Sequence, residues 1–143
     1  MIWFQKDIQI SQLERLMTNT MGEFLGMKFT EIGEDYLKMS LPVTDKTKQP
    51  YGYIHGGANC VLIETLGSIA SALVIDHQKQ YCVGIEINAN HLRSVTSGSV
   101  VGTAKPLHLG RTTHVWEVKI HTDEGKLSCA GRITVAILDQ KRK

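Results

Sequence analysis

Hydrophobic and polar residues alternate along most of the second half of the chain. In the clearest run Trp116, Val118 and Ile120 share one face, while Glu117 and Lys119 share the other. A period of two residues is typical of a strand with one face in a core. The same pattern recurs between turn-forming residues, and it predicts four strands at 81–92, 100–107, 114–121 and 127–138.

The first third of the chain carries shorter signals. Two strand-like runs, 27–32 and 36–41, flank a Gly-Glu-Asp turn, which is typical of a hairpin. Upstream of them, Ser11-Gln-Leu-Glu14 fits a capping box, and the apolar residues after it repeat at helical spacing. We therefore expect a short helix at about 11–20, which the following glycines end.

The most hydrophobic segment runs from Gly57 to Ile75 and is about long enough to cross a bilayer. Glu64 lies near its middle, however, and a carboxylate there would be costly in lipid. We expect a buried helix (about residues 57–75) on one face of an antiparallel sheet, in a single α+β domain of residues 1–143. Because this helix is apolar almost all round, either the sheet curls around it or a second copy covers it.

Composition excludes several classes of protein. Of the 143 residues, 42% are hydrophobic and 21% charged, so a disordered or fibrous protein is not expected. A net charge of +2, with no long basic run besides the tail 141–143, argues against a general nucleic-acid binder. The three cysteines form no CxxC pair, and we expect no metal and no cofactor. The first residues lack a secretory pattern, so we expect a cytoplasmic protein.

Two groups of residues at the long helix could carry chemistry. Glu64 is the only charged residue of this helix, and Ser68, four positions later, can donate a hydrogen bond to it. His55, Gly56 and Gly57 open the helix, where free N–H groups and small residues suit a developing oxyanion. The alternatives are a partly exposed glutamate at the helix edge and a tight turn with a hydrogen-bonded histidine.

The spacing of these groups restricts how they could act together. Gly56 and Glu64 lie eight positions apart, which is about 12 Å along a helix. An oxyanion donor must lie roughly 3 Å from its oxygen, and a nucleophile must be almost as near the same carbonyl. Two antiparallel helices across a two-fold axis can satisfy both distances. If both residues act on one carbonyl, the site is therefore shared between two subunits.

Longer motifs resemble a known family. The run Gln49-Pro-Tyr-Gly-Tyr-Ile-His55-Gly-Gly-Ala-Asn-Cys-Val-Leu-Ile-Glu64-Thr-Leu-Gly-Ser68 is similar to the hotdog-fold acyl-CoA thioesterases. Residues 84–94 and 105–111 resemble the same family, in the 4-hydroxybenzoyl-CoA thioesterase branch that carries its glutamate on the helix. More narrowly, they resemble 1,4-dihydroxy-2-naphthoyl-CoA hydrolase and the proofreading thioesterase of enterobactin synthesis. The similarity extends over nearly the whole chain.

This resemblance implies a fold and a reaction. The fold would be a hotdog, an antiparallel sheet wrapped around the long helix, in a homodimer with shared active sites that assembles into a homotetramer. The reaction would be hydrolysis of an acyl-CoA thioester without a cofactor. Glu64 would be the nucleophile or general base, and the Gly56 N–H would be the oxyanion donor. Gln49 and His55 of the opposite subunit would position the thioester, and Ser68 would orient Glu64 or water.

The resemblance also implies substrate-binding residues. The nucleotide end of coenzyme A needs cations and hydrogen-bond donors at a rim, and by similarity we assign them to His91, Arg93, Ser94 and Arg111. Tyr51 and Ile69 match positions that line the acyl pocket. Asn59 departs from the branch, which often has a small residue there, and this leaves the acyl preference open.

Several alternatives stay open at this point. The same residues could act on acyl groups bound to an acyl carrier protein, or the chain could be a non-catalytic acyl-CoA-binding regulator. Aromatic acyl groups are the first expectation, although such enzymes are often broad. The sequence does not distinguish menaquinone biosynthesis from siderophore proofreading or general aromatic metabolism.

Overall fold

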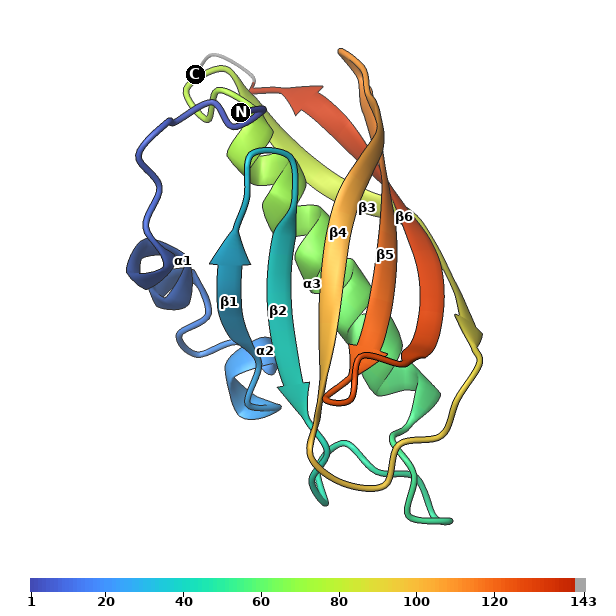
Figure 1. The fold of residues 1–143 in the computed structure, drawn as a ribbon. Helices are drawn as coiled ribbons and strands as arrows, with labels where there is room; N and C mark the ends of the chain where they lie inside the picture. Colours follow the sequence, from blue (N-terminus) through green and yellow to red (C-terminus); the bar gives the residue numbers. More distant parts are fainter. Residues whose placement is uncertain (141–143) are drawn as a thin grey trace.

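Six antiparallel strands form one curved sheet in the computed structural model, which describes residues 1–140 (Figure 1). The basic tail 141–143 lies outside the described residues. The strands follow one another across the sheet in the order β1-β2-β4-β5-β6-β3. Their bounds are β1 Lys28–Ile32, β2 Leu37–Pro42, β3 Gln80–His91, β4 Ser99–Leu109, β5 Thr113–Thr122 and β6 Leu127–Asp139. All six predicted strands, four from the alternation and two from the hairpin signal, are confirmed, with boundaries that differ by one or two residues.

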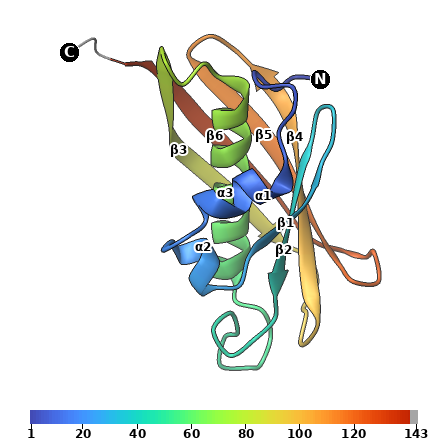
Figure 2. The same cartoon turned by 90° about the vertical axis from the view of Figure 1, so that its left-hand side faces the viewer.

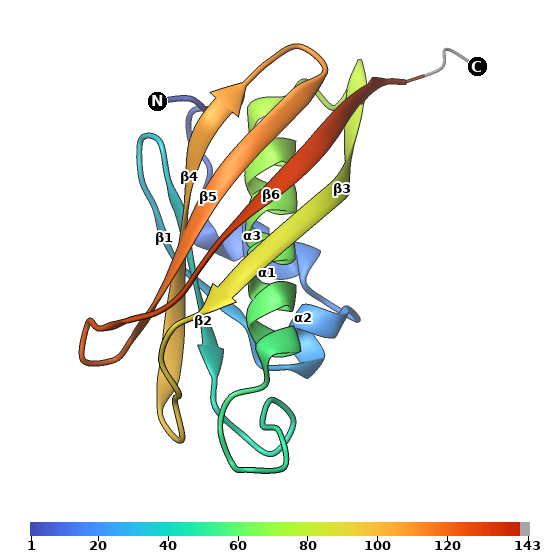
Figure 3. The ribbon, with the colours of Figure 1, turned by 90° about the vertical axis from the view of Figure 1, so that its right-hand side faces the viewer.

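The long helix α3 (Gly56–Val74) lies in the concave face of this sheet (Figures 1 and 3). It is long and apolar enough to cross a membrane by length and composition alone, but here it packs on the sheet. The residues that it buries recur at helical spacing and are Ala58, Asn59, Leu62, Ile63, Leu66, Gly67, Ala70 and Ser71. The expected antiparallel sheet wrapped around a central helix is therefore confirmed.

The inner face of the sheet packs against α3 as the alternation predicted. Trp116, Val118 and Ile120 of β5 have no exposed surface, and the Trp116 indole N–H donates to Ser71 Oγ at 2.8 Å. At Gly67 the helix comes close to β6, since a Cβ atom on this residue would overlap the side chain of Ile133. The other face of α3 is only half-buried, since the sheet covers one side of the helix.

The N-terminal segment covers part of that other side with two short helices, α1 (Ile10–Leu16) and α2 (Met21–Phe24) (Figure 2). The predicted single helix at 11–20 is therefore wrong beyond residue 16. The predicted capping box is also displaced, because the Gln12 side chain accepts from the Gln9 backbone N–H at 2.8 Å. Asn19 has the left-handed φ of 60°, which ends the first helix before Thr20 caps the second.

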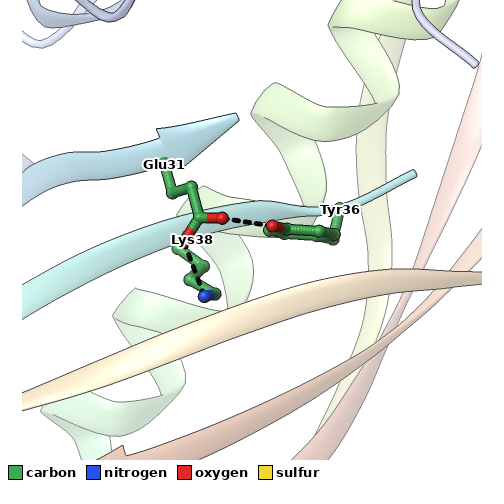
Figure 4. Close-up of polar contacts among 3 residues, drawn as sticks. All are labelled: Glu31, Tyr36 and Lys38. Atoms are coloured by element: carbon green, nitrogen blue, oxygen red, sulfur yellow. Dashed lines mark hydrogen bonds and ion pairs between the residues drawn. The ribbon is translucent and has the colours of Figure 1, made fainter. Parts of the chain in front are cut away.

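The β1–β2 hairpin has a polar cluster on its surface (Figure 4). Glu31 accepts a hydrogen bond from the Tyr36 hydroxyl and pairs with Lys38 Nζ at 2.6 Å. The hydrogen bond from Lys38 holds the pKa of Glu31 below its usual range. On the other side of the turn, Trp3 Nε1 donates to the Gly33 carbonyl at 2.7 Å. The hairpin thus fixes the N-terminal segment that leads to α1.

Candidate active site

The first turn of α3 begins at His55, which caps the helix. Its Nδ1 atom accepts a hydrogen bond from the Gly57 N–H at 2.8 Å. The ring is exposed, and an accepting Nδ1 leaves the proton of the neutral ring on Nε2. The alternative of a hydrogen-bonded histidine in a turn is thus present in the structure, and the positioning role of His55 stays a prediction.

A polar cavity of about 310 Å³ lies beside this first turn. It collects predicted residues from the loop before α3, from α3 itself, and from the end of β3 and the segment after it, namely Gln49, Gly56, His91, Arg93 and Ser94. The His91 ring lies directly over Gly56, because a Cβ atom there would be 2.8 Å from His91 Nε2. Hydrogen-bonding groups from three parts of the chain therefore surround the N-terminal end of the helix.

Asn59 is a member of this cavity that the sequence did not single out for a role. Its side chain is 2% exposed, and Nδ2 lies 3.2 Å from His91 Nδ1. The other amide atom, Oδ1, has no hydrogen-bond partner within residues 1–140. Such buried acceptors are uncommon in proteins. The sequence offered one signal for Asn59, namely a polar amide side chain at a position of the helix where the apolar pattern predicts burial.

Glu64 lies two turns further along α3, in an apolar groove of about 510 Å³. Its side chain is half-buried, and Ser68 Oγ donates to Glu64 Oε1 at the long distance of 3.5 Å. Ile69 lines the same groove. The sequence suggested a glutamate with apolar neighbours on every side, whereas the structure places it at the border between the groove and solvent.

Gly84 of β3 makes room for this carboxylate and was missed as a site residue. A Cβ atom on Gly84 would overlap Glu64 Oε1. The β3–β6 pairing also shifts register between Gly84 and Glu86, so the strand is irregular at this point. Glycine within a strand often marks such a close approach or a bulge. A glycine in the predicted strand 81–92 was therefore the signal that could have identified Gly84.

The two halves of the expected chemistry occupy separate places in one protomer. Glu64 and Ser68 line the apolar groove, while Gln49 and Gly56 line the polar cavity. The two sets of lining residues have no member in common. One protomer therefore presents a carboxylate half-site and a donor half-site.

Two predicted substrate residues lie apart from both half-sites. Arg111 is exposed in the turn between β4 and β5, where it lines a third cavity of about 480 Å³ with His114. Tyr51 is 85% exposed in the loop before α3, and it is absent from the apolar groove. Within one protomer the structure does not bring either residue to the others, and their roles stay predictions.

The cysteines are not arranged for a metal or a disulfide. All three thiols are free, and Cys129 of β6 is buried in the core. Burial raises the pKa of the Cys129 thiol to about 11, so it stays protonated. Within residues 1–140 no group of three or more His, Cys, Asp or Glu side chains could hold a metal ion.

Comparisons with known proteins place this chain in a family. The model of the Thioesterase superfamily matches residues 51–129. This range includes α3 with Gly56, Glu64 and Ser68. The 1,4-dihydroxy-2-naphthoyl-CoA hydrolase of Escherichia coli is 46% identical over 138 residues, covering 96% of this chain and 100% of that protein. A proofreading thioesterase of Cronobacter sakazakii is 42% identical over 138 residues, covering 96% and 99%.

Solved structures agree with the sequence matches. A mutant thioesterase from Pseudomonas aeruginosa superposes with a TM-score of 0.95 and 44% identity, covering 98% of this chain and 100% of that chain. A thioesterase from Haemophilus influenzae has a TM-score of 0.93 and 40% identity, covering 97% and 96%. The chain therefore belongs to the thioesterase superfamily, and it is a thioester hydrolase with the hotdog fold.

Proposed function

We propose that the protein hydrolyses acyl-CoA thioesters to a free acid and coenzyme A. The observation that carries this proposal is the position of Glu64, a carboxylate at the edge of an apolar groove with Ser68 beside it. Glu64 attacks the thioester carbonyl, or it removes a proton from the attacking water. If Glu64 attacks, the C–S bond breaks as an acyl anhydride with Glu64 forms, and water then hydrolyses this anhydride and frees Glu64. If Glu64 acts as the base, water adds to the carbonyl carbon before the C–S bond breaks. In both routes the thiolate of coenzyme A leaves and takes up a proton.

The active site forms between two copies of the chain. Strand β3 is the last strand of the sheet and leaves its outer edge unpaired within the described residues (Figure 3). Tyr81, Val83 and Ile85 of this strand are 45%, 42% and 60% exposed. A long apolar edge of this kind is a template for pairing with another strand. Pairing across a two-fold axis supports a homodimer in which the start of one α3 meets the middle of the other. Assembly of dimers into a tetramer remains an expectation.

The two half-sites then hold different parts of the substrate. The apolar groove takes the acyl group, because the carbonyl that Glu64 attacks is directly attached to it. The Gly56 N–H of the second copy stabilises the oxyanion, and Gln49 positions the thioester. The polar cavity continues to His91, Arg93 and Ser94, which take the coenzyme A side, with Arg111 as a further cation at the rim.

The relatives support an aromatic acyl group as the first substrate to try. One of them is named for 1,4-dihydroxy-2-naphthoyl-CoA, an intermediate whose hydrolysis would place this chain in menaquinone biosynthesis. Another is named a proofreading thioesterase, which supports broader use or acyl groups on a carrier protein. Turnover of one acyl group on coenzyme A and on a carrier protein separates these two possibilities.

A Glu64→Gln variant tests the proposed role of the carboxylate. The amide keeps the shape of the side chain but can neither attack the carbonyl nor accept the proton. We expect thiol release from benzoyl-CoA or 1,4-dihydroxy-2-naphthoyl-CoA to fall by several orders of magnitude with an unchanged melting temperature. Glu14→Gln, an exposed change on α1, serves as the matched control. Near-normal turnover by Glu64→Gln would contradict the assignment.

A further inference from the structure

The apolar groove has two walls of different origin. One wall comes from α3 and β3 and carries Glu64, Ser68 and Ile69. The opposite wall comes from the α1–α2 segment and consists of Leu16, Met17, Thr20, Met21 and Gly22. The Thioesterase superfamily match begins at residue 51 and so includes only the first wall. The second wall therefore lies outside the part of the chain that the family model describes.

The α1–α2 wall is anchored on its inner side. Leu13 and Met17 are 2% and 7% exposed, so they fix the segment to the core. The Met17 methyl group rests on Gly22, where any Cβ atom would overlap it. Thr20 caps α2 by accepting from the Glu23 N–H. These contacts hold the segment at one position beside α3 (Figure 2).

Two apolar side chains of the same segment are not packed into the core and line the groove instead. Leu16 and Met21 line it, yet they remain 56% and 64% exposed. Apart from Glu64, no residue that lines the groove carries a charge. The phosphates of coenzyme A therefore have no partner here, whereas a hydrocarbon does. Methionine is also flexible enough to fit several shapes of hydrocarbon.

We infer that Leu16 and Met21 are specificity-determining residues, which set the size of hydrocarbon acyl group that the enzyme hydrolyses. This inference rests on the proposed function, because it takes Glu64 as the group that attacks the carbonyl. The acyl chain extends from the carbonyl along the groove and contacts the α1–α2 wall at its far side. A larger side chain at position 21 blocks long acyl groups, and a smaller one leaves them without a contact.

The test compares two substrates that differ in reach, benzoyl-CoA and decanoyl-CoA, by the rate of thiol release. Met21→Trp narrows the groove, so we expect the ratio of kcat/KM for decanoyl-CoA over benzoyl-CoA to fall at least about tenfold. Leu16→Ala removes hydrocarbon contact and should lower the same ratio by about threefold to tenfold. Melting temperatures establish that each variant is folded.

Phe24→Ala is the matched control, because Phe24 lies on α2 with the same 64% exposure as Met21 but does not line the groove. Its ratio should stay within about twofold of the unaltered protein. An unchanged ratio in Met21→Trp, or an equal fall in Phe24→Ala, would overturn the inference while leaving the hydrolase intact. If the unaltered protein releases no thiol from either substrate, the proposed function fails, and the inference fails with it.

Discussion

Two side chains at opposite ends of α3 carry a buried polar atom without a partner among residues 1–140. Asn59 lines the polar cavity of the candidate site, and His114 of β5 lines a cavity with Val74 at the other end of the helix. His114 is 3% exposed and packs edge-on against Trp116. Burial, with a smaller contribution from His108, lowers the pKa of His114. The first residue therefore belongs to the site, while the second affects stability.

His114 makes the protein sensitive to acid. Its folded-state pKa lies below the unfolded value near 6.5, so the unfolded chain binds a proton first as the pH falls. The contribution of His114 to the free energy of unfolding is thus largest above about pH 6.5 and decreases below it. We expect His114→Gln to lose less stability than the unaltered protein between pH 7.5 and pH 5, as measured by urea denaturation. His77→Gln, at an exposed position, should follow the unaltered protein, and equal slopes in all three would refute the prediction.

At the scale of elements, β3 and α3 meet at the proposed nucleophile. The Glu64 carboxylate rests against the bare backbone of Gly84, at the irregular point of the β3–β6 pairing. This position in the strand has no side chain, so nothing pushes the carboxylate away from the groove. The strand therefore helps to set the direction of the proposed nucleophile.

A methyl group at this crossing should impair catalysis more than folding. In Gly84→Ala the new Cβ atom overlaps Glu64 Oε1, and the flexible carboxylate must turn away. We expect kcat for benzoyl-CoA to fall at least about tenfold, because small misplacements of a reacting group are costly. The melting temperature should change by only a few degrees. Glu86→Ala, an exposed change across the bulge, is the control, and normal kcat in Gly84→Ala would refute the role.

The N-terminal helices show where local patterns misled. The apolar spacing of Leu13, Leu16 and Met17 predicted one helix to residue 20, but Asn19 takes a left-handed conformation and divides the segment. Asparagine tolerates this conformation better than other residues with a side chain. A second helix then begins at Met21, within the region expected to be a break. This irregular segment became one wall of the groove.

In the whole molecule, the carboxylate half-site and the donor half-site are separated along one helix. The expectation of a shared site was drawn from the rise of a helix, and the separate linings of the groove and cavity support it. The edge of β3, unpaired within residues 1–140, is the surface that we propose for the second copy. We therefore propose that function at this scale requires at least two chains.

Mixed dimers test this requirement directly. Subunits with Glu64→Gln and subunits with Gln49→Ala should each be nearly inactive when alone. After random mixing, half of the dimers combine both types, and each of these has one intact site, so about a quarter of the original activity should return. Mass spectrometry of differently tagged chains measures how many mixed dimers form. Mixed dimers without recovered activity would contradict the shared site.

The elements of the fold were predictable because their signals are local. Alternation in β5 reports which side of that strand is buried, and the apolar run of α3 reports that this helix belongs to the core. Both signals depend on neighbours in the sequence. The motif around His55 and Glu64 likewise lies within one continuous stretch. The family, the central helix and the main candidate residues therefore followed from the order of amino acids.

The shape of the site depended on contacts between distant segments, which no local pattern encodes. Asn59 meets His91 across 32 positions, and Gly84 meets Glu64 from a different element. The wall of Leu16 and Met21 lies beside α3 on the side of that helix that the sheet leaves uncovered. Curvature of the sheet and packing of α3 therefore decided which residues surround the carboxylate, since burial brings together segments that the chain keeps far apart.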